Sequence, residues 1–306
     1  MKELWVEKYR PKTVDGYVFR DANQRKQITT WIRDKSIPHL LLSGSPGIGK
    51  TTLAKLLLHE IEIPEYDILE MNASRERGIK EVQERITNFV QMIPFGPFKV
   101  VLLDEADYLT PEAQAALRGV MEQYSSTSRF ILTCNHPNKV IPAIHSRCQS
   151  MHFTSIDQTE FTARVATILV EENIEFDLDT LDTYVKTVYP DLRKCINFVQ
   201  QNTQDGILIG ANNSDVGQAD YKIAMVDLFK RGKIQEARKL VCGAARPEEM
   251  EEVYRWLYDN LDLFGKDEET KDQALIIIKQ GLVDHAIIAD PEINLAATLV
   301  KLARLQ

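Results

Sequence analysis

The stretch that decides the fold is Gly44-Ser45-Pro46-Gly47-Ile48-Gly49-Lys50-Thr51, which matches the pattern G-x-x-x-x-G-K-[ST] in full. The apolar run His39–Leu42 precedes it and predicts a strand, and a helical pattern follows over Thr51–Glu60. Strand, glycine-rich turn and helix in this order are the context in which the pattern wraps phosphate. A chance glycine-rich turn is the alternative, and it does not account for the flanking elements.

The residue types in this loop suit a nucleoside triphosphate, here ATP. Glycines let backbone N–H groups turn inward around phosphate oxygens, and the start of the helix adds a favourable dipole. Lys50 is expected to bridge the β- and γ-phosphates, and the Thr51 hydroxyl to ligate Mg²⁺. The residues of this stretch expected to hold the nucleotide are Gly47, Ile48, Gly49, Lys50, Thr51 and Thr52.

A second polar group follows the apolar run Val100–Leu103, which predicts another buried strand. Parallel sheets place ligand chemistry at the carboxyl ends of their strands, so Asp104 is the expected second anchor for Mg²⁺. Glu105 is the candidate general base for an attacking water. Asp107 is interpreted as structural. The alternative is an exposed turn carboxylate beside a capping acid.

The pattern around these motifs predicts an α/β fold. Tyr66–Met71 and Phe130–Thr133 are further strand candidates, which indicates a parallel sheet covered on both faces. Thr110-Pro111-Glu112 predicts a helix start. Beyond Thr154 the strand patterns fade. Helices are expected over 157–172, 177–188 and 190–202, then a linker over 203–217 and a helical remainder.

Composition limits the class of protein. The chain has 306 residues and a net charge of −8, which taken alone argues against nucleic-acid binding but does not exclude a local basic groove. The printed sequence has no apolar run near the roughly 20 residues needed to span a bilayer and no apolar signal segment at its start, so a cytoplasmic protein without a membrane partner is expected. The four cysteines are widely spaced, which favours free thiols over a zinc site.

Five motifs, in order, resemble those of AAA+ sliding-clamp-loader ATPases of the replication factor C small subunit family. The motifs are Trp5–Pro11, the Walker B type run Asp104–Asp107, the sensor-1 type strand Ser125–Asn135, Ser146-Arg147-Cys148, and Pro190–Arg193 with its sensor-2 arginine. The resemblance covers about residues 4–200. The compact length and divergent last third look closer to the bacteriophage large clamp-loader subunit than to a cellular one.

The resemblance implies roles for particular residues. Asn135 would hold the attacking water or the γ-phosphate, or else cap a turn. Arg193 would reach the γ-phosphate and pull a helical lid shut, or else be a solvated helix charge. Arg147 would act as an arginine finger on a neighbouring subunit's ATP, or else form a local salt bridge. Five residues would wrap the adenine and ribose, although they also suit a capping and core segment: Val6, Glu7, Lys8, Tyr9 and Val18.

The resemblance also implies DNA contacts through the backbone, without sequence preference. The expected DNA-binding residues are Arg75, Arg77, Lys80, Arg85 and Arg118. Glutamates lie between several of these cations, so an ordinary solvated helix surface is the alternative. Arg77 has a second expected role, in which it pairs with Glu105 when DNA is absent and holds that base off the water.

The implied architecture is an AAA+ P-loop nucleotide domain over 1–154, a helical lid over 155–207 and a helical collar for oligomerisation over 218–306. The implied function is that of a clamp-loader ATPase subunit, with ATP and Mg²⁺ as cofactors. Its expected partners are a sliding clamp, primer–template DNA and other subunits in a pentamer-like ring or spiral, in viral replication in a host cytoplasm if the chain is phage-encoded. The alternatives are another AAA+ DNA-remodelling motor, of the branch-migration helicase type, or a nucleotide-dependent scaffold that assembles on DNA without hydrolysis.

Overall fold

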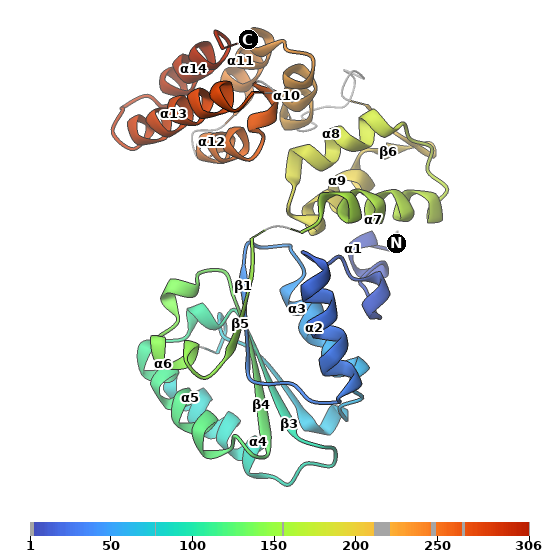
Figure 1. Cartoon of the computed structure of the whole chain (residues 1–306), viewed down its shortest axis with the longest axis vertical. Helices are drawn as coiled ribbons and strands as arrows, with labels where there is room; N and C mark the ends of the chain where they lie inside the picture. Colours follow the sequence, from blue (N-terminus) through green and yellow to red (C-terminus); the bar gives the residue numbers. More distant parts are fainter. Residues whose placement is uncertain are drawn as a thin grey trace. The chain divides into compact units, whose positions relative to one another are not determined.

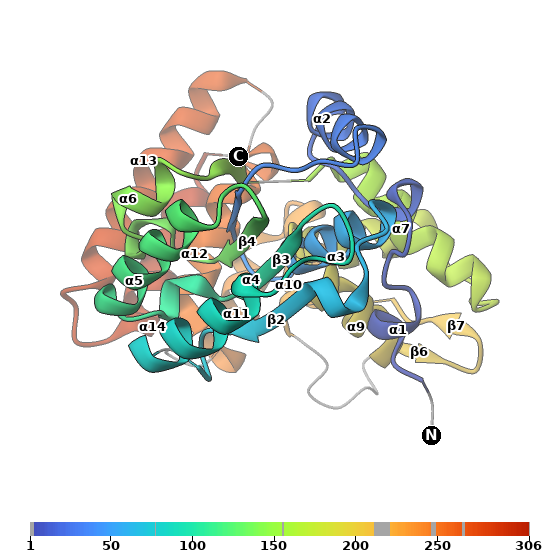
Figure 2. The same ribbon diagram turned by 90° about the horizontal axis from the view of Figure 1, so that it is seen from below.

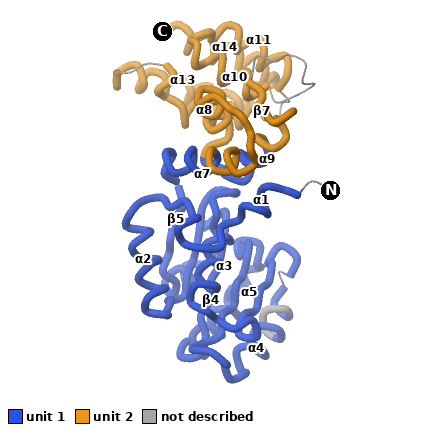
Figure 3. Tube along the Cα trace, turned by 90° about the vertical axis from the view of Figure 1, so that its right-hand side faces the viewer, with its two compact units in different colours: residues 1–165, 190–197 blue, residues 166–189, 198–306 orange. Residues whose placement is uncertain are grey.

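The computed structural model describes residues 3–76, 78–154, 156–210, 221–245, 249–264 and 267–305, with the backbone alone at residues 81–83. The chain forms two compact units (Figure 3). The first contains residues 1–165 and 190–197, and the second contains residues 166–189 and 198–306.

A five-stranded parallel sheet forms the centre of the first unit. Its order is β2-β3-β4-β1-β5, and every neighbouring pair is parallel. Figure 2 shows β2, β3 and β4 side by side. The strands are β1 (Leu40–Gly44), β2 (Ile68–Asn72), β3 (Lys99–Asp104), β4 (Ser128–Cys134) and β5 (Gln149–Phe153). The predicted parallel α/β fold is confirmed.

Helices cover both faces of this sheet (Figure 1). Alternate residues of a strand point to opposite faces, so Leu40 and Leu42 pack in one apolar cluster and Leu41 in the other. The first cluster includes α2 (Ala22–Arg33) and α3 (Lys50–Glu60). The second includes α4 (Thr87–Gln91), α5 (Pro111–Gln123) and α6 (Pro142–His145). The three inner strands β1, β3 and β4 are buried on both faces, which explains their continuous apolar runs.

Local rules account for the helix starts. The Thr110 hydroxyl accepts a hydrogen bond from the Ala113 N–H at 3.2 Å, and Pro111 occupies the first turn of α5, as the sequence predicts. Asp21 caps α2 in the same way through the Gln24 N–H at 2.8 Å. Neither α2 nor β5 is among the elements that the sequence predicts.

Short helical turns connect these elements. They are α1 (Trp5–Lys8), η1 (Val14–Gly16), η2 (Glu65–Asp67), η3 (Glu81–Ile86), η4 (Ala106–Tyr108) and η5 (Pro137–Lys139). The η3 turn has the wider π-type hydrogen bonding and continues directly into α4.

The helices predicted after residue 156 are confirmed as α7 (Gln158–Glu171), α8 (Leu178–Val188) and α9 (Leu192–Gln201). The predicted linker begins instead with a small hairpin of β6 (Thr203–Gln204) and β7 (Ile207–Leu208), because Asp205 and Gly206 adopt the positive φ of a tight turn. Residues 211–217 of that linker lie outside the described residues.

The rest of the second unit is helical, as predicted, around an apolar cluster of its own. Its elements are α10 (Tyr221–Lys230), α11 (Ile234–Ala244), α12 (Met250–Asp259), η7 (Leu261–Leu263), α13 (Glu268–His285) and α14 (Pro291–Leu302). Within the described ranges, none of the helices combines the length and the apolar character that a bilayer crossing requires.

Candidate functional site

The loop between β1 and α3 has the backbone shape that the phosphate-loop pattern predicts. Gly47 and Gly49 adopt positive φ angles of 73° and 90°, and Gly49 is the N-terminal cap of α3. Both also face close neighbours. A Cβ atom at Gly47 would lie 1.8 Å from Oδ1 of Asp191, and one at Gly49 would lie 3.1 Å from the Tyr17 ring. A side chain at Gly47 would therefore have to displace the Asp191 carboxylate, in a backbone conformation that residues other than glycine rarely adopt.

Lys50 points back over this loop and is itself buried. Its ammonium donates to the carbonyls of Gly44 and Ser45 at 2.8 and 2.7 Å, and to Oδ1 of Asn135 at 2.9 Å. Burial lowers the pKa of Lys50, and the acids Asp104 and Asp107 act in the opposite direction. Lys50 and Asn135, 85 positions apart in the sequence, are thus hydrogen-bonded. This is expected because β1 and β4 are neighbouring strands.

Asp104 ends β3 beside the start of α3. Its Oδ1 accepts from the Thr51 hydroxyl at 2.7 Å and from the Thr133 hydroxyl. The Thr133 oxygen in turn accepts the Glu105 N–H at 3.1 Å. Thr51 and Asp104, the predicted metal pair, are therefore adjacent, and Thr133 is a contact that the sequence does not predict.

Glu105 has an unusual backbone. Its φ of 58° and ψ of 42° lie in the left-handed region, which for a residue with a side chain costs on the order of 1 kcal/mol or more. Lys50, Thr51, Asp104, Glu105 and Asn135 line one open cavity of about 530 Å³, mouth included. Its other lining residues are Pro46, Gly47, Gly49, Thr52, Thr133, Cys134 and Arg193.

Asp107 hydrogen-bonds to the loop that carries Asn135. Oδ2 of Asp107 accepts the N–H of His136 at 3.0 Å, while Oδ1 is buried and has no hydrogen-bond partner among the described residues. This hydrogen bond supports the structural interpretation of Asp107, because the Asp107 carboxylate holds His136, the residue next to Asn135.

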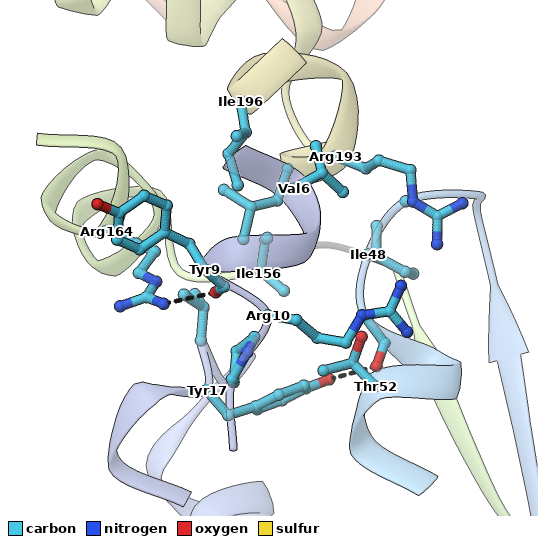
Figure 4. A pocket seen from close by; sticks show the side chains of 15 residues that line it. Val6, Tyr9, Arg10, Tyr17, Ile48, Thr52, Ile156, Arg164, Arg193 and Ile196 are labelled. Carbon is cyan, nitrogen blue, oxygen red and sulfur yellow. Dashed lines mark hydrogen bonds between the residues drawn. The ribbon is translucent and has the colours of Figure 1, made fainter. Parts of the chain in front are cut away.

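A second cavity adjoins the first. It is open, of about 620 Å³, and shares Gly47, Gly49, Thr52 and Arg193 with the phosphate cavity. Figure 4 shows Val6, Tyr9, Tyr17, Ile48, Ile156 and Ile196 around it. An apolar wall next to a phosphate loop suits the base and sugar of a nucleotide.

Only some of the residues predicted to wrap the adenine and ribose line this second cavity. Val6, Tyr9 and Val18 line it, whereas Glu7 and Lys8 do not. Glu7 pairs with Arg10 at 2.8 Å, and the Lys8 ammonium lies over the Tyr9 ring at 5.1 Å.

Seven lining residues are absent from the sequence-based set: Arg10, Pro11, Tyr17, Ile156, Arg164, Leu192 and Ile196. Arg164 donates to the Tyr9 carbonyl at 2.7 Å, and Tyr17 to the Gly49 carbonyl at 3.4 Å (Figure 4). Three of them belong to motifs quoted from the sequence: Arg10 and Pro11 to Trp5–Pro11, and Leu192 to Pro190–Arg193. The other four become neighbours only through the fold.

Arg193 is the second residue of α9 and lines both cavities. Asp191 precedes it and accepts the Lys194 N–H at 2.8 Å, which caps the helix. Burial raises the pKa of the Asp191 carboxyl, against the pull of Arg193 and Lys194. The contact between Asp191 and Gly47 therefore joins the start of α9 to the phosphate loop.

Arg147 lies outside both cavities. It follows α6, and its guanidinium pairs with Glu122 of α5 and donates to the Ala143 carbonyl at 2.6 Å. The local salt bridge considered from the sequence is present, and the arginine side chain remains 31% exposed. Its predicted role toward a neighbouring subunit stays a prediction.

The predicted DNA-contacting residues lie on the unit that contains the cavities. Arg75, Lys80, Arg85 and Arg118 are exposed. Arg85 pairs with Glu76, and Arg118 lies 3.9 Å from Glu122. Arg77, with its predicted pairing to Glu105, lies outside the described residues.

Comparison with known proteins agrees with these features. Residues 40–156 match the family model of the ATPase family associated with various cellular activities (AAA). Among solved structures, the Thermotoga maritima RuvB Holliday junction branch migration motor is similar with a TM-score of 0.54, over 63% of this chain and 66% of that one. At 17% identity, this likeness shows the fold alone.

Curated relatives are much more similar over the whole length. The replication factor C small subunit of Sulfurisphaera tokodaii is 36% identical over 98% of this chain and 95% of its own. That of Methanococcus maripaludis is 34% identical, with both chains covered in full. The chain therefore belongs to the replication factor C small subunit family.

Proposed function

We propose how this chain, an ATPase subunit of a clamp loader by its family, binds and hydrolyses ATP. The base and sugar lie in the apolar cavity, and the triphosphate runs along Gly44–Thr51 into the polar one. The observation that carries this proposal is the convergence of Lys50, Thr51, Asp104, Glu105, Asn135 and Arg193 on one cavity, which shares lining residues with the apolar one.

The residues at the end of β3 fit Mg²⁺. Oxygen atoms of a hydroxyl and a carboxylate are ligands that this ion prefers, and Thr51 and Asp104 present them 2.7 Å apart. When bound there, the ion would neutralise charge on the phosphate oxygens. The Thr133 hydroxyl orients Asp104 for this role.

Hydrolysis is in-line attack of water on the γ-phosphoryl group. Glu105 orients and deprotonates the water, a role supported by its place among the residues that line the polar cavity, as Asn135 also does. The Lys50 ammonium exchanges its contacts with loop carbonyls for phosphate oxygens. Arg193 closes over the γ-phosphate from α9, and Arg147 of one subunit completes the site of the next.

DNA contact is assigned to Arg75, Lys80, Arg85 and Arg118, with Arg77 as a further candidate. Support comes from their exposure on the unit that holds the ATP site. Contacts to phosphates give affinity without sequence preference, as a protein that engages any primer–template junction requires. Several subunits in a spiral would multiply these charges and offset the net charge of −8.

Two exposed apolar surfaces support the proposed protein partners. On the first unit, Tyr66, Met92, Ile93 and Phe95 are 55–87% exposed, and the rings of Tyr66 and Phe95 lie 6.2 Å apart. This surface is proposed to receive the sliding clamp. Ile276, Leu282 and Val283 of α13, with Ile287 just beyond its end, are 43–80% exposed, which supports a collar that joins subunits.

The three parts 1–154, 155–207 and 218–306 are proposed to be the domains that move relative to one another. The viral, host-cytoplasmic setting is likewise a proposal, made from the resemblance seen in the sequence. The genes beside the coding sequence would test it, since phage replication genes are expected there.

The experiment that tests the function is phosphate release from the purified chain, alone and mixed with its partner subunits, clamp and primed DNA. We expect little turnover alone and joint stimulation by clamp and DNA, because the trans arginine is missing from a single subunit. Glu105→Gln should abolish turnover and leave ATP binding intact. Turnover that survives Glu105→Gln contradicts the assigned base, and assembly without any turnover favours the non-hydrolysing scaffold.

A further inference from the structure

One carboxylate lies between two arginines of different proposed function. Glu122 is in the last turn of α5, and Arg118 is one turn earlier on the same helix. Oε1 of Glu122 receives Nη2 of Arg147, and the same oxygen is 3.9 Å from Nε of Arg118. Glu122 thus faces both the proposed DNA-contacting arginine and the proposed trans arginine.

The donors of Arg147 are only partly used. A guanidinium carries five N–H donors in a rigid fork. Nη1 donates to the Ala143 carbonyl at 2.6 Å and to the Ser146 hydroxyl at 3.2 Å, and Nη2 donates to Glu122. Among the described residues, Nε and the second Nη2 hydrogen have no acceptor. The guanidinium can therefore keep its present contacts and still donate to a phosphate oxygen.

This pair contributes little to folding. The side chains of Arg147 and Glu122 are 31% and 47% exposed, and ion pairs at such sites are screened by solvent. What the contact does is restrict a long and flexible side chain. An arginine held in one orientation loses less conformational freedom when it reaches its target.

We infer that Glu122 is a positioning residue that couples DNA contact at Arg118 to the orientation of the trans arginine Arg147. The inference rests on the proposed function, in which these two arginines meet DNA and a neighbour's ATP. A DNA phosphate that binds Arg118 draws it away from Glu122. The whole carboxylate is then available to Arg147, whose guanidinium is fixed toward the adjoining site.

The test uses the assembled loader with Glu122→Gln in this chain. Glutamine keeps the size and removes the charge. We expect kcat for DNA-stimulated phosphate release to fall about 10- to 100-fold, the range that misplacement of a catalytic group produces. KM for ATP should not change, because Glu122 lines neither cavity of its own subunit.

A matched control is Glu112→Gln. Glu112 is exposed on the same helix, makes no ion pair among the described residues, and undergoes the same change of charge. It should behave as wild type. Glu122→Asp should recover part of the lost rate, because it restores the charge. Thermal unfolding of all three variants should match wild type.

A double-mutant cycle tests the link to DNA. If Arg118 acts on Arg147 through Glu122, Glu122→Gln should lower DNA stimulation by a smaller factor in an Arg118→Gln background than in wild type. Equal factors in both backgrounds would overturn the coupling.

The failure of this inference differs from failure of the proposed function. If Arg147→Ala abolishes DNA-stimulated turnover while Glu122→Gln leaves it at the wild-type rate, the inference is wrong and the function stands. If Arg147→Ala itself retains full turnover, the trans role is wrong, and the inference falls with it.

Discussion

At the scale of single residues, Lys50 is the side chain on which the ATP site depends most. A buried ammonium is costly unless it is hydrogen-bonded, and here two loop carbonyls and Asn135 supply acceptors. These three contacts keep the cation at the mouth of the phosphate loop before any ligand arrives. The site is therefore preorganised, which reduces the ordering that nucleotide binding requires.

Lys50→Met should remove about 2–5 kcal/mol of ATP-binding free energy, as expected when one partner of a desolvated charge contact is lost. Binding of a fluorescent ATP analogue measures this. Lys55→Met is the control, because Lys55 lies on the same helix but forms an exposed pair with Glu70 at 2.7 Å. Equal losses in both variants would show that the charge of the unit, rather than the position of Lys50, sets affinity.

At the scale of elements, a buried ion pair ties the start of β2 to the start of β3. Asp67 and Lys99 are both almost fully buried, with Nζ and Oδ1 3.0 Å apart, and Oδ2 of Asp67 also accepts the Gly96 N–H at 2.7 Å. The Lys99 ammonium lies 4.5 Å from the centre of the Phe89 ring. This pair anchors the segment that carries Ile93 and Phe95.

The Asp67–Lys99 pair predicts a dependence of stability on pH. Burial by itself raises the pKa of Asp67, but the Gly96 N–H and the Lys99 ammonium together bring it below the usual value. Its stabilisation is therefore complete above the unfolded-state pKa of about 3.9 and is lost as pH falls through the lower folded-state pKa.

Asp67→Asn should lower the free energy of unfolding by about 3–5 kcal/mol at pH 7, because it leaves a buried cation without its counter-charge. The difference from wild type should shrink at pH values below the folded-state pKa. Urea unfolding at several pH values measures it, with the exposed Asp15→Asn as control. A difference that stays constant with pH would contradict the titration of Asp67.

Helix packing in the second unit gives a further prediction. A Cβ atom at Gly281 of α13 would lie 2.4 Å from the Thr298 hydroxyl of α14 and 2.8 Å from the Tyr254 ring of α12. Gly281→Ala should therefore lower the midpoint of thermal unfolding, at a cost of about 1–3 kcal/mol. Gly243→Ala in α11 has open space and should raise stability by about 0.5–1 kcal/mol. Circular dichroism melts compare the two, and similar stabilisation by both would contradict the close contact.

At the scale of the whole molecule, charge decides how DNA binding must arise. The chain carries a net charge of −8, so an isolated copy is a poor ligand for a polyanion. Exposed cations on one unit become effective only where several copies place them along the same duplex. Assembly and DNA binding are thus expected to be coupled.

The assembled loader should bind primed DNA with a steep dependence on salt, and the isolated chain only weakly. Each phosphate contact adds about −0.9 to the slope of log K against log salt concentration. Arg118→Gln should make the slope shallower by about 0.9 for every subunit whose Arg118 touches DNA. Fluorescence anisotropy at several salt concentrations measures this, and an unchanged slope would remove Arg118 from the DNA surface.

Local patterns in the sequence were enough to predict the parts of the site that depend on consecutive residues. The phosphate loop, the acidic end of β3 and the start of α5 each consist of a few neighbouring positions, so periodicity and turn chemistry predict them directly. β5 was missed because it is an edge strand with polar residues exposed, and its sequence Gln149–Phe153 lacks the apolar run of a buried strand.

Only the tertiary structure decided which distant residues share a surface. Tyr17, Ile156 and Ile196 line the apolar cavity because the start of the chain, the end of the sheet domain and α9 meet there. The contact of Glu122 with Arg147 spans 25 positions and belongs to no local pattern. Sequence alone determined the chemistry of the phosphate loop, because that chemistry depends on residues that are adjacent in the chain. The fold decided which side chains surround it, because such contacts depend on how separate elements pack.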